Sequence, residues 1–166
     1  MTRTYFQTVR GFDRDVKLIL LSSGLFGFSL FTGVQGLLFN LYLLRMDYGP
    51  EFVGLVLGIG SFVFGVSCLP GGFLGSRFES RSTILAGTSV MAIAFLILTQ
   101  AELIPATFRK AFIVLCYSTS LMGWSLYRVN SSPYLMKITP SEERNHVFSV
   151  FAALMPLSGF AGNLLG

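Results

Sequence analysis

Five apolar stretches, each long enough to cross a lipid bilayer, fill most of the 166 residues of this chain. A helix needs about 20 apolar residues to span the hydrocarbon core of a membrane. Short segments rich in polar residues, glycine and proline separate the stretches, and such segments are typical of turns. The sequence therefore predicts an all-α protein, a polytopic transmembrane helical bundle forming a single membrane domain over residues 1–166. The expected spans cover about 17–44, 51–74, 82–101, 111–135 and 146–166.

The composition excludes the other broad classes of protein. Apolar residues make up 52% of the chain and charged residues 12%, whereas soluble domains carry about 25% charged residues. Disordered chains are poor in aromatic residues, but here they reach 14%. The basic residues lie at the ends of the apolar stretches, which suits lipid headgroups better than a phosphate backbone. We therefore expect the lipid bilayer as a partner, and no nucleic acid.

The distribution of Lys and Arg predicts the orientation. Eight of the twelve basic residues lie at one set of helix ends and three at the other. Cytoplasmic loops carry the excess of Lys and Arg, so we expect a multi-pass protein of the cell membrane with a cytoplasmic N-terminus. The last stretch ends without a basic anchor, and we expect a truncated chain. The eight are Arg3, Arg10, Arg14, Lys17, Arg77, Arg81, Lys137 and Arg144, and the three are Arg45, Arg109 and Lys110.

A polar stripe marks the fourth stretch. At about 100° per residue, its polar and aromatic members fall within an arc of roughly 100°. Polar groups are costly against lipid, so the stripe should face protein or a water-filled cavity. The members are Tyr117, Ser120, Trp124, Tyr127, Arg128 and Ser131.

Arg128 is the charged residue of this stripe, and it lies inside the predicted membrane span. A guanidinium inside the membrane costs about 3 kcal/mol on insertion scales and stays charged. One interpretation is snorkelling, or a structural pair with a carboxylate; the five spans contain no Asp or Glu inside them, so that partner would come from a loop. The other interpretation is an electropositive point on a solute pathway. Both stay open, and the second suggests an anionic solute.

The first two stretches carry further candidate residues. In the first, Asn40 belongs to a side of small and polar residues and Gln35 lies further round. This stripe suggests a cavity wall or a helix contact, and for Asn40 alone an interhelical hydrogen bond is favoured. The candidate solute pathway therefore comprises Gln35, Asn40, Trp124, Arg128 and Ser131. In the second, six small residues share one face, which predicts close helix packing. These six are Gly54, Gly58, Ser61, Gly65, Cys68 and Gly72.

Signals for catalysis are missing from the sequence. There is no nucleophile–base constellation, no metal-ligand cluster and no phosphate-binding glycine loop. We therefore expect neither an enzyme nor a cofactor or metal site.

The segment between the second and third stretches resembles the signature loop of the major facilitator superfamily, whose pattern is roughly G-x-L-x-D-R-x-G-R-R. Gly72, Leu74, Arg77 and Arg81 match that pattern. Ser76 stands where the family usually has Asp, and Glu79 stands where it has Gly. The segment 140–144 also resembles the family's P-x-E-R stretch before the fifth span.

The resemblance implies a secondary active solute transporter that works by alternating access, with two six-helix bundles around a central site. It implies that the loop residues form a conformational motif. It also implies a further partner, either the missing C-terminal half or a second copy of the chain. The alternative from another class is a helical membrane scaffold or assembly protein that transports nothing.

Overall fold

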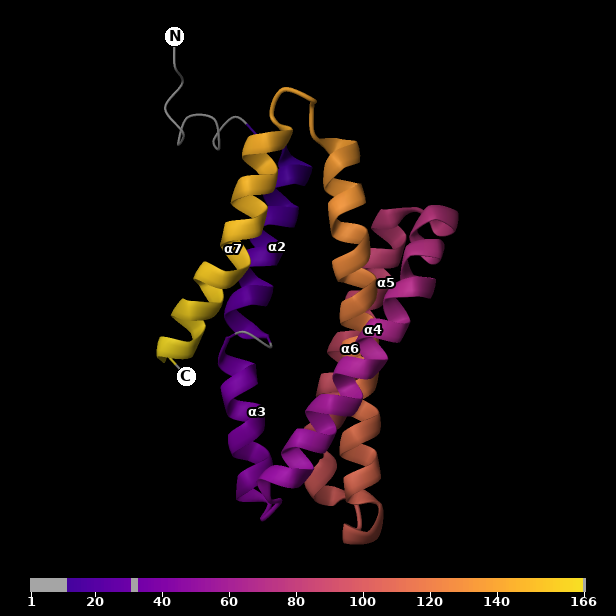
Figure 1. Ribbon diagram of the computed structural model, residues 1–166, viewed down its shortest axis with the longest axis vertical. Helices are drawn as coiled ribbons and strands as arrows, with labels where there is room; N and C mark the ends of the chain where they lie inside the picture. The colour runs from indigo at the N-terminus through magenta and orange to yellow at the C-terminus, as the bar shows by residue number, and fades with distance from the viewer. Residues whose placement is uncertain (1–11, 31–32, 166) are drawn as a thin grey trace. The chain divides into compact units, whose positions relative to one another are not determined.

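The computed structural model describes residues 12–30 and 33–165, and Arg3 and Arg10 lie outside this part of the chain. The described residues form helices joined by short turns, without a strand, which confirms the predicted all-α class (Figure 1). The helices are α2 (Arg14–Ser29), α3 (Val34–Arg45), α4 (Pro50–Phe78), α5 (Ser80–Leu98), the short 3₁₀ helix η1 (Ala101–Leu103), α6 (Ala106–Ile138) and α7 (Arg144–Leu165).

Contacts between residues divide the chain into two compact units. The first unit comprises residues 1–47 and 135–166, and therefore contains α2, α3, α7 and the last turn of α6. The second comprises residues 48–134, with α4, α5 and most of α6. The expected single membrane domain stays a prediction.

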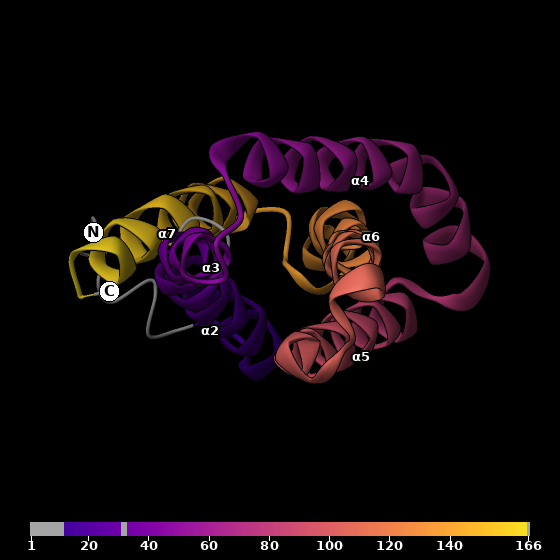
Figure 2. The same ribbon diagram turned by 90° about the horizontal axis from the view of Figure 1, so that it is seen from below.

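In the first unit, α2 and α7 run side by side in both views (Figures 1 and 2). Glycines bring their backbones together. A Cβ atom added at Gly27 would lie 2.8 Å from the Cα of Met155 on α7. Gly162 lies against the carbonyl of Phe28, and a Cβ added there would lie 3.1 Å from the Cα of Gly33. Such close approach is the usual way in which membrane helices associate.

The first apolar stretch consists of two helices rather than one. α2 ends at Ser29 and α3 begins at Val34, with Leu30 in an extended conformation (φ −96°, ψ −152°). Gly162 contacts a residue on each side of this break, Phe28 before it and Gly33 after it. A close backbone contact favours glycine there, and glycine weakens a helix. Hydropathy alone could not distinguish a broken helix from a continuous one, because both halves are apolar.

The second unit is built around α6, which lies between α4 and α5 (Figure 2). On the α4 side, a Cβ added at Gly60 would lie 2.6 Å from the Leu121 Cδ1 atom. On the α5 side, a Cβ added at Gly87 would lie 2.6 Å from the carbonyl oxygen of Gly123. Only Glu79 separates α4 from α5. The unit is thus a helical hairpin whose two arms both contact α6.

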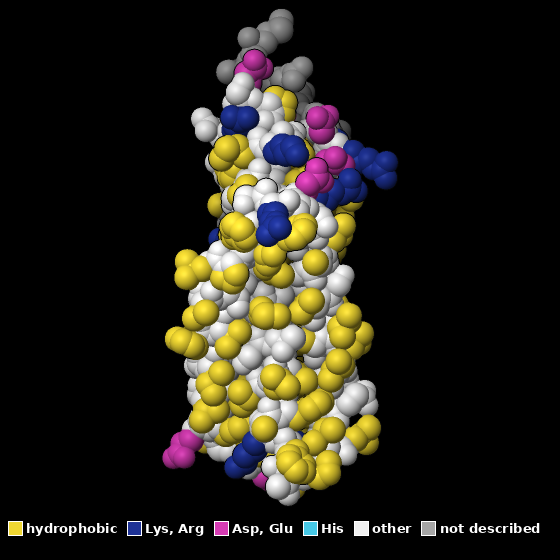
Figure 3. Space-filling view, turned by 90° about the vertical axis from the view of Figure 1, so that its right-hand side faces the viewer, with side chains coloured by type: hydrophobic (Ala, Val, Ile, Leu, Met, Phe, Trp, Pro, Cys, Tyr) yellow, Lys and Arg dark blue, Asp and Glu magenta, His cyan; other side chains and the backbone are white. Residues whose placement is uncertain are grey.

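Of the described helices, α4, α5 and α7 are each long and apolar enough to cross a membrane, and so is the segment 14–45 that contains α2 and α3. α6 has 33 residues, a length of about 50 Å at 1.5 Å per residue, but its polar residues lower its hydropathy. Its crossing of the membrane stays a prediction. Figure 3 shows hydrophobic side chains over the middle of one face and charged side chains at its two ends.

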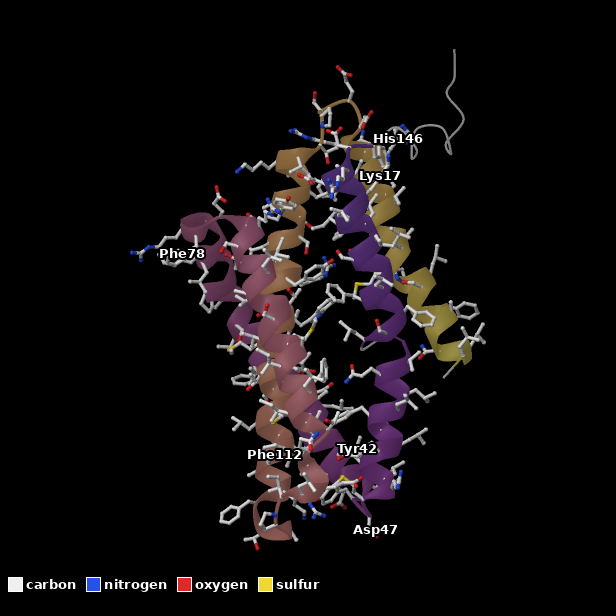
Figure 4. The ribbon with its side chains drawn as sticks, turned by 180° about the vertical axis from the view of Figure 1, so that it is seen from behind. Lys17, Tyr42, Asp47, Phe78, Phe112 and His146 are labelled. Atoms are coloured by element: carbon white, nitrogen blue, oxygen red, sulfur yellow. The ribbon has the colours of Figure 1, made fainter. Side chains whose placement is uncertain are left out.

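The starts of α2 and α7 lie at the same end of the first unit. Within the first unit, Lys17 and His146 lie at one end and Tyr42 and Asp47 at the other (Figure 4). The short connections leave each helix antiparallel to the next in the α4–α5 hairpin. The cytoplasmic assignment of the N-terminus stays a prediction.

Candidate functional site

The polar stripe predicted on the fourth stretch lies on α6. Trp124 and Tyr127 stack with ring centroids 5.1 Å apart and planes 18° from parallel. Both are buried, as is Ser131. The Ser131 hydroxyl donates a hydrogen bond to the backbone carbonyl of Tyr127. The Ser131 hydroxyl is therefore satisfied within its own helix, beside the two stacked rings.

Arg128 differs from its neighbours on the stripe because its side chain is exposed. No ion pair or hydrogen bond joins it to another residue of the described part of the chain. It lies ten residues before the end of α6 at Ile138, a distance of about 15 Å along the helix. A structural pair between Arg128 and a loop carboxylate is thus not formed among the described residues.

Gln35 and Asn40 lie on α3, in the first unit. The Oε1 atom of Gln35 and the Oδ1 atom of Asn40 are buried without a hydrogen-bond partner in the described residues. A buried acceptor without a donor costs about 1–3 kcal/mol, so such atoms call for an explanation. The interhelical hydrogen bond expected of Asn40 therefore does not engage this oxygen within the described residues.

The five candidate pathway residues fall into two groups. Trp124, Arg128 and Ser131 share one helix of the second unit, whereas Gln35 and Asn40 belong to the first. Arg128 offers a guanidinium that could interact with a solute. Gln35 and Asn40 offer two side-chain carbonyl oxygens.

The signature loop lies at the junction of α4 and α5. Gly72 and Leu74 are half-buried on α4, whereas Ser76, Arg77 and Arg81 are exposed. The Ser76 hydroxyl donates to the carbonyl of Phe73 at 2.8 Å, and the Arg77 guanidinium carbon lies 5.6 Å from the centroid of the Phe78 ring.

Glu79 has a left-handed backbone, with φ 69° and ψ 135°. Its carbonyl accepts two hydrogen bonds from Thr83, one from the amide and one from the hydroxyl, both of 3.1 Å. Left-handed φ values favour glycine, which is the residue that the family's pattern places here. The structure therefore gives a physical reason for that pattern and identifies Glu79 as a strained departure from it.

The small-residue face predicted on α4 meets no described neighbour at three of its positions. Nothing among the described residues lies within 4 Å of a Cβ added at Gly54, Gly58 or Gly65. The glycines of α4 that are buried are Gly60, Gly71 and Gly75, and they lie on a different face. Within the described chain these three positions have no packing partner, so the close packing predicted for them stays a prediction. The spacing of small residues along a helix shows that one face is smooth. It does not show which face of the helix a neighbouring helix covers.

Sequence analysis missed Asn130. This residue is 2% exposed, and its Nδ2 group donates to the carbonyl of Gly71 on α4 at 3.0 Å and to that of Leu126 at 2.9 Å. The available signal was an amide side chain inside an apolar helix, opposite a glycine-rich helix. It was hidden because Asn130 lies off the polar stripe.

Among the described residues, no group of three or more His, Cys, Asp or Glu could hold a metal ion. In a comparison with family models, the model of the Major Facilitator Superfamily matches residues 6–166. Neither the curated proteins nor the solved structures gave a match. Because the family model covers nearly the whole chain and agrees with its apolar helices, this multi-pass membrane protein belongs to the major facilitator superfamily, a family of transporters.

Proposed function

We propose that the protein takes part in secondary active transport of a solute by alternating access, in the cell membrane and with its N-terminus in the cytoplasm. Membership of the superfamily supports transport over a scaffold role and over an enzymatic one. The excess of Lys and Arg at one set of helix ends supports the orientation.

The observation that carries the proposal is that the Arg128 side chain is exposed and unpaired among the described residues. A permanent charge inside an apolar helix is expensive unless it is paired or hydrated, yet Arg128 is exposed and forms no ion pair with a described residue. A charge of this kind suits a hydrated pathway. Its planar donor fork matches a carboxylate or a phosphate, so the proposed solute carries an anionic group.

Gln35 and Asn40, in the first unit, stay candidate pathway residues that would offer hydrogen-bond acceptors. The buried oxygens of Gln35 and Asn40 have no partner in the described chain, and a solute hydroxyl, amide or amine could donate to them. Trp124 and Ser131 would line the proposed pathway beside Arg128, on the same stripe of α6.

Further helices would complete the pathway. The open glycines of α4, Gly54, Gly58 and Gly65, leave a smooth surface without a neighbour among the described residues. We propose that this surface accepts helices from the C-terminal half of a longer transporter or from a second copy of the chain.

The test is a thermal-shift screen of small carboxylate and phosphate solutes on the purified protein. When the free concentration of a bound solute is 100 times its dissociation constant, the free energy of unfolding rises by about 2.7 kcal/mol. Arg128→Leu should remove this stabilisation, and Arg128→Lys should weaken it because lysine keeps the charge but loses the fork. Arg45→Leu, which removes an exposed arginine from the end of α3, is the matched control and should leave it unchanged.

A structural role for Arg128 predicts the opposite pattern. Arg128→Leu would then lower the amount of folded protein in the membrane, while the remaining protein would still be stabilised by the solute. Uptake normalised to folded protein gives the same distinction in cells. Unchanged normalised uptake in Arg128→Leu would remove Arg128 from the pathway.

A further inference from the structure

The C-terminal half of α4 contains a segment that should not hold a helix by itself. Pro70, Gly71, Gly72 and Gly75 occupy four of the six positions from 70 to 75. Proline lacks the amide that would bond to the carbonyl four residues earlier, and glycine has the greatest backbone freedom to lose. Nevertheless α4 continues through this segment to Phe78. Contacts from outside the helix must therefore hold it.

Those contacts come from one face of α6. Leu126, Val129 and Asn130 have the i, i+3, i+4 spacing of neighbours on a helix. A Cβ added at Gly71 would lie 3.2 Å from Leu126 Cδ2, and one at Gly72 would lie 3.6 Å from Val129 Cγ1. The face covers the weak segment and contributes one polar group, the Asn130 amide.

The Asn130 side chain fits a notch that the glycines leave open. Its Nδ2 group donates to the Gly71 carbonyl at 3.0 Å, and its Oδ1 atom occupies the space that a Cβ at Gly75 would take. The amide therefore inserts between two successive turns of α4. Any larger residue at Gly75 would displace it.

Movement in this segment would reach the signature loop directly. Ser76, Arg77 and Phe78 complete α4, and Glu79 alone connects them to α5. The two hydrogen bonds from Thr83 to the Glu79 carbonyl fix this tip to the first turn of α5. A bend between residues 70 and 75 would move the tip as one piece.

We propose that residues 70–75 form a hinge in α4 and that Asn130 latches it, which makes Asn130 a positioning residue for the signature loop. The proposal goes beyond the transport function, since it concerns the mobility of the loop and requires no solute.

The test is hydrogen exchange of the full chain in lipid nanodiscs, followed by mass spectrometry of peptides from α4, α5 and α6. Asn130→Leu keeps a similar shape but removes the hydrogen bond to Gly71. Loss of one such bond corresponds to about tenfold faster exchange, and we expect this only for the backbone amides of residues 71–79, since Pro70 has none. Ser125→Ala is the matched control, because its hydroxyl bonds only within α6, to the Met122 carbonyl at 2.7 Å. Exchange of 71–79 that is unchanged in Asn130→Leu, or equally faster throughout the three helices, would overturn the proposal.

A second substitution tests the hinge without touching Asn130. The position 72 has room for a methyl group, because the nearest side-chain atom lies 3.6 Å from an added Cβ. Gly72→Ala should therefore stiffen the segment and slow exchange of 71–79 by about fivefold, and should suppress the acceleration caused by Asn130→Leu. Gly58→Ala on the same helix should leave 71–79 unchanged. Failure of Gly72→Ala to slow exchange would show that the segment is not a hinge.

Discussion

Replacing Glu79 by glycine should stabilise the protein. Glu79 is the entire connection between α4 and α5, and its backbone has φ 69° and ψ 135°. An L-residue with a side chain is strained at such a φ, because its Cβ approaches the following carbonyl. Glycine has no Cβ and adopts this conformation freely. The expected gain comes from the backbone and not from the carboxylate.

The magnitude follows from two opposing effects. A residue held in a sparsely populated backbone region costs about 1–3 kcal/mol. Glycine loses more conformational freedom on folding, which offsets about 0.5–1 kcal/mol of that gain. The net stabilisation is therefore about 1 kcal/mol, or about 2–4 °C in Tm for a chain of this size.

Thermal unfolding of the purified protein in one detergent measures the change. Glu79→Gln is the matched control, because it removes the charge and keeps the Cβ. The carboxylate lies at the C-terminal end of α4 and the N-terminal end of α5, whose dipoles act on it in opposite directions. Its removal should therefore leave Tm nearly unchanged. An equal rise in Tm in Glu79→Gln and Glu79→Gly would show that backbone strain at residue 79 is not the cause. A lower Tm in Glu79→Gly would show the same.

Two further predictions concern packing and topology. Gly123→Ala should destabilise the protein by about 1–3 kcal/mol, because its Cβ would lie 2.5 Å from the Gly87 carbonyl oxygen and force α5 and α6 apart. Gly58→Ala, with nothing described within 4 Å, should be neutral or stabilising by up to about 1 kcal/mol; equal Tm changes in the two variants would contradict this packing. In a cysteine-free background, Ser80→Cys should react with an impermeant maleimide only after permeabilisation, and Asp47→Cys in intact cells; labelling of position 80 from outside would reverse the orientation.

The fold class could be predicted from the sequence because a bilayer imposes a strict length on apolar helices. The signature loop was identifiable for another reason: Gly72, Leu74, Arg77 and Arg81 match the pattern of the family between two apolar stretches. The stripe on α6 was also recognisable, since a polar residue in an apolar helix stands out at helical spacing.

Contacts between helices could not be predicted in the same way. Gly58 and Gly60 both look suitable for packing, but only Gly60 meets a neighbour in the described chain. The choice depends on how α4 is rotated towards α6, which spacing within one helix does not specify. The break after Ser29 depends likewise on a distant residue, because Gly162 of α7 lies against the Phe28 carbonyl.

Arg128 and Asn130 show how one helix can carry two separable roles. They are two residues apart on α6, and therefore point in directions about 200° apart. Asn130 is buried against α4, whereas Arg128 is exposed. The two proposals therefore predict different patterns in the same pair of assays. Arg128→Leu should abolish stabilisation by an anionic solute and leave exchange of residues 71–79 unchanged. Asn130→Leu should accelerate that exchange without removing the guanidinium. If each variant altered both measurements equally, α6 would be responding as a whole, and neither side chain would have the specific role assigned to it.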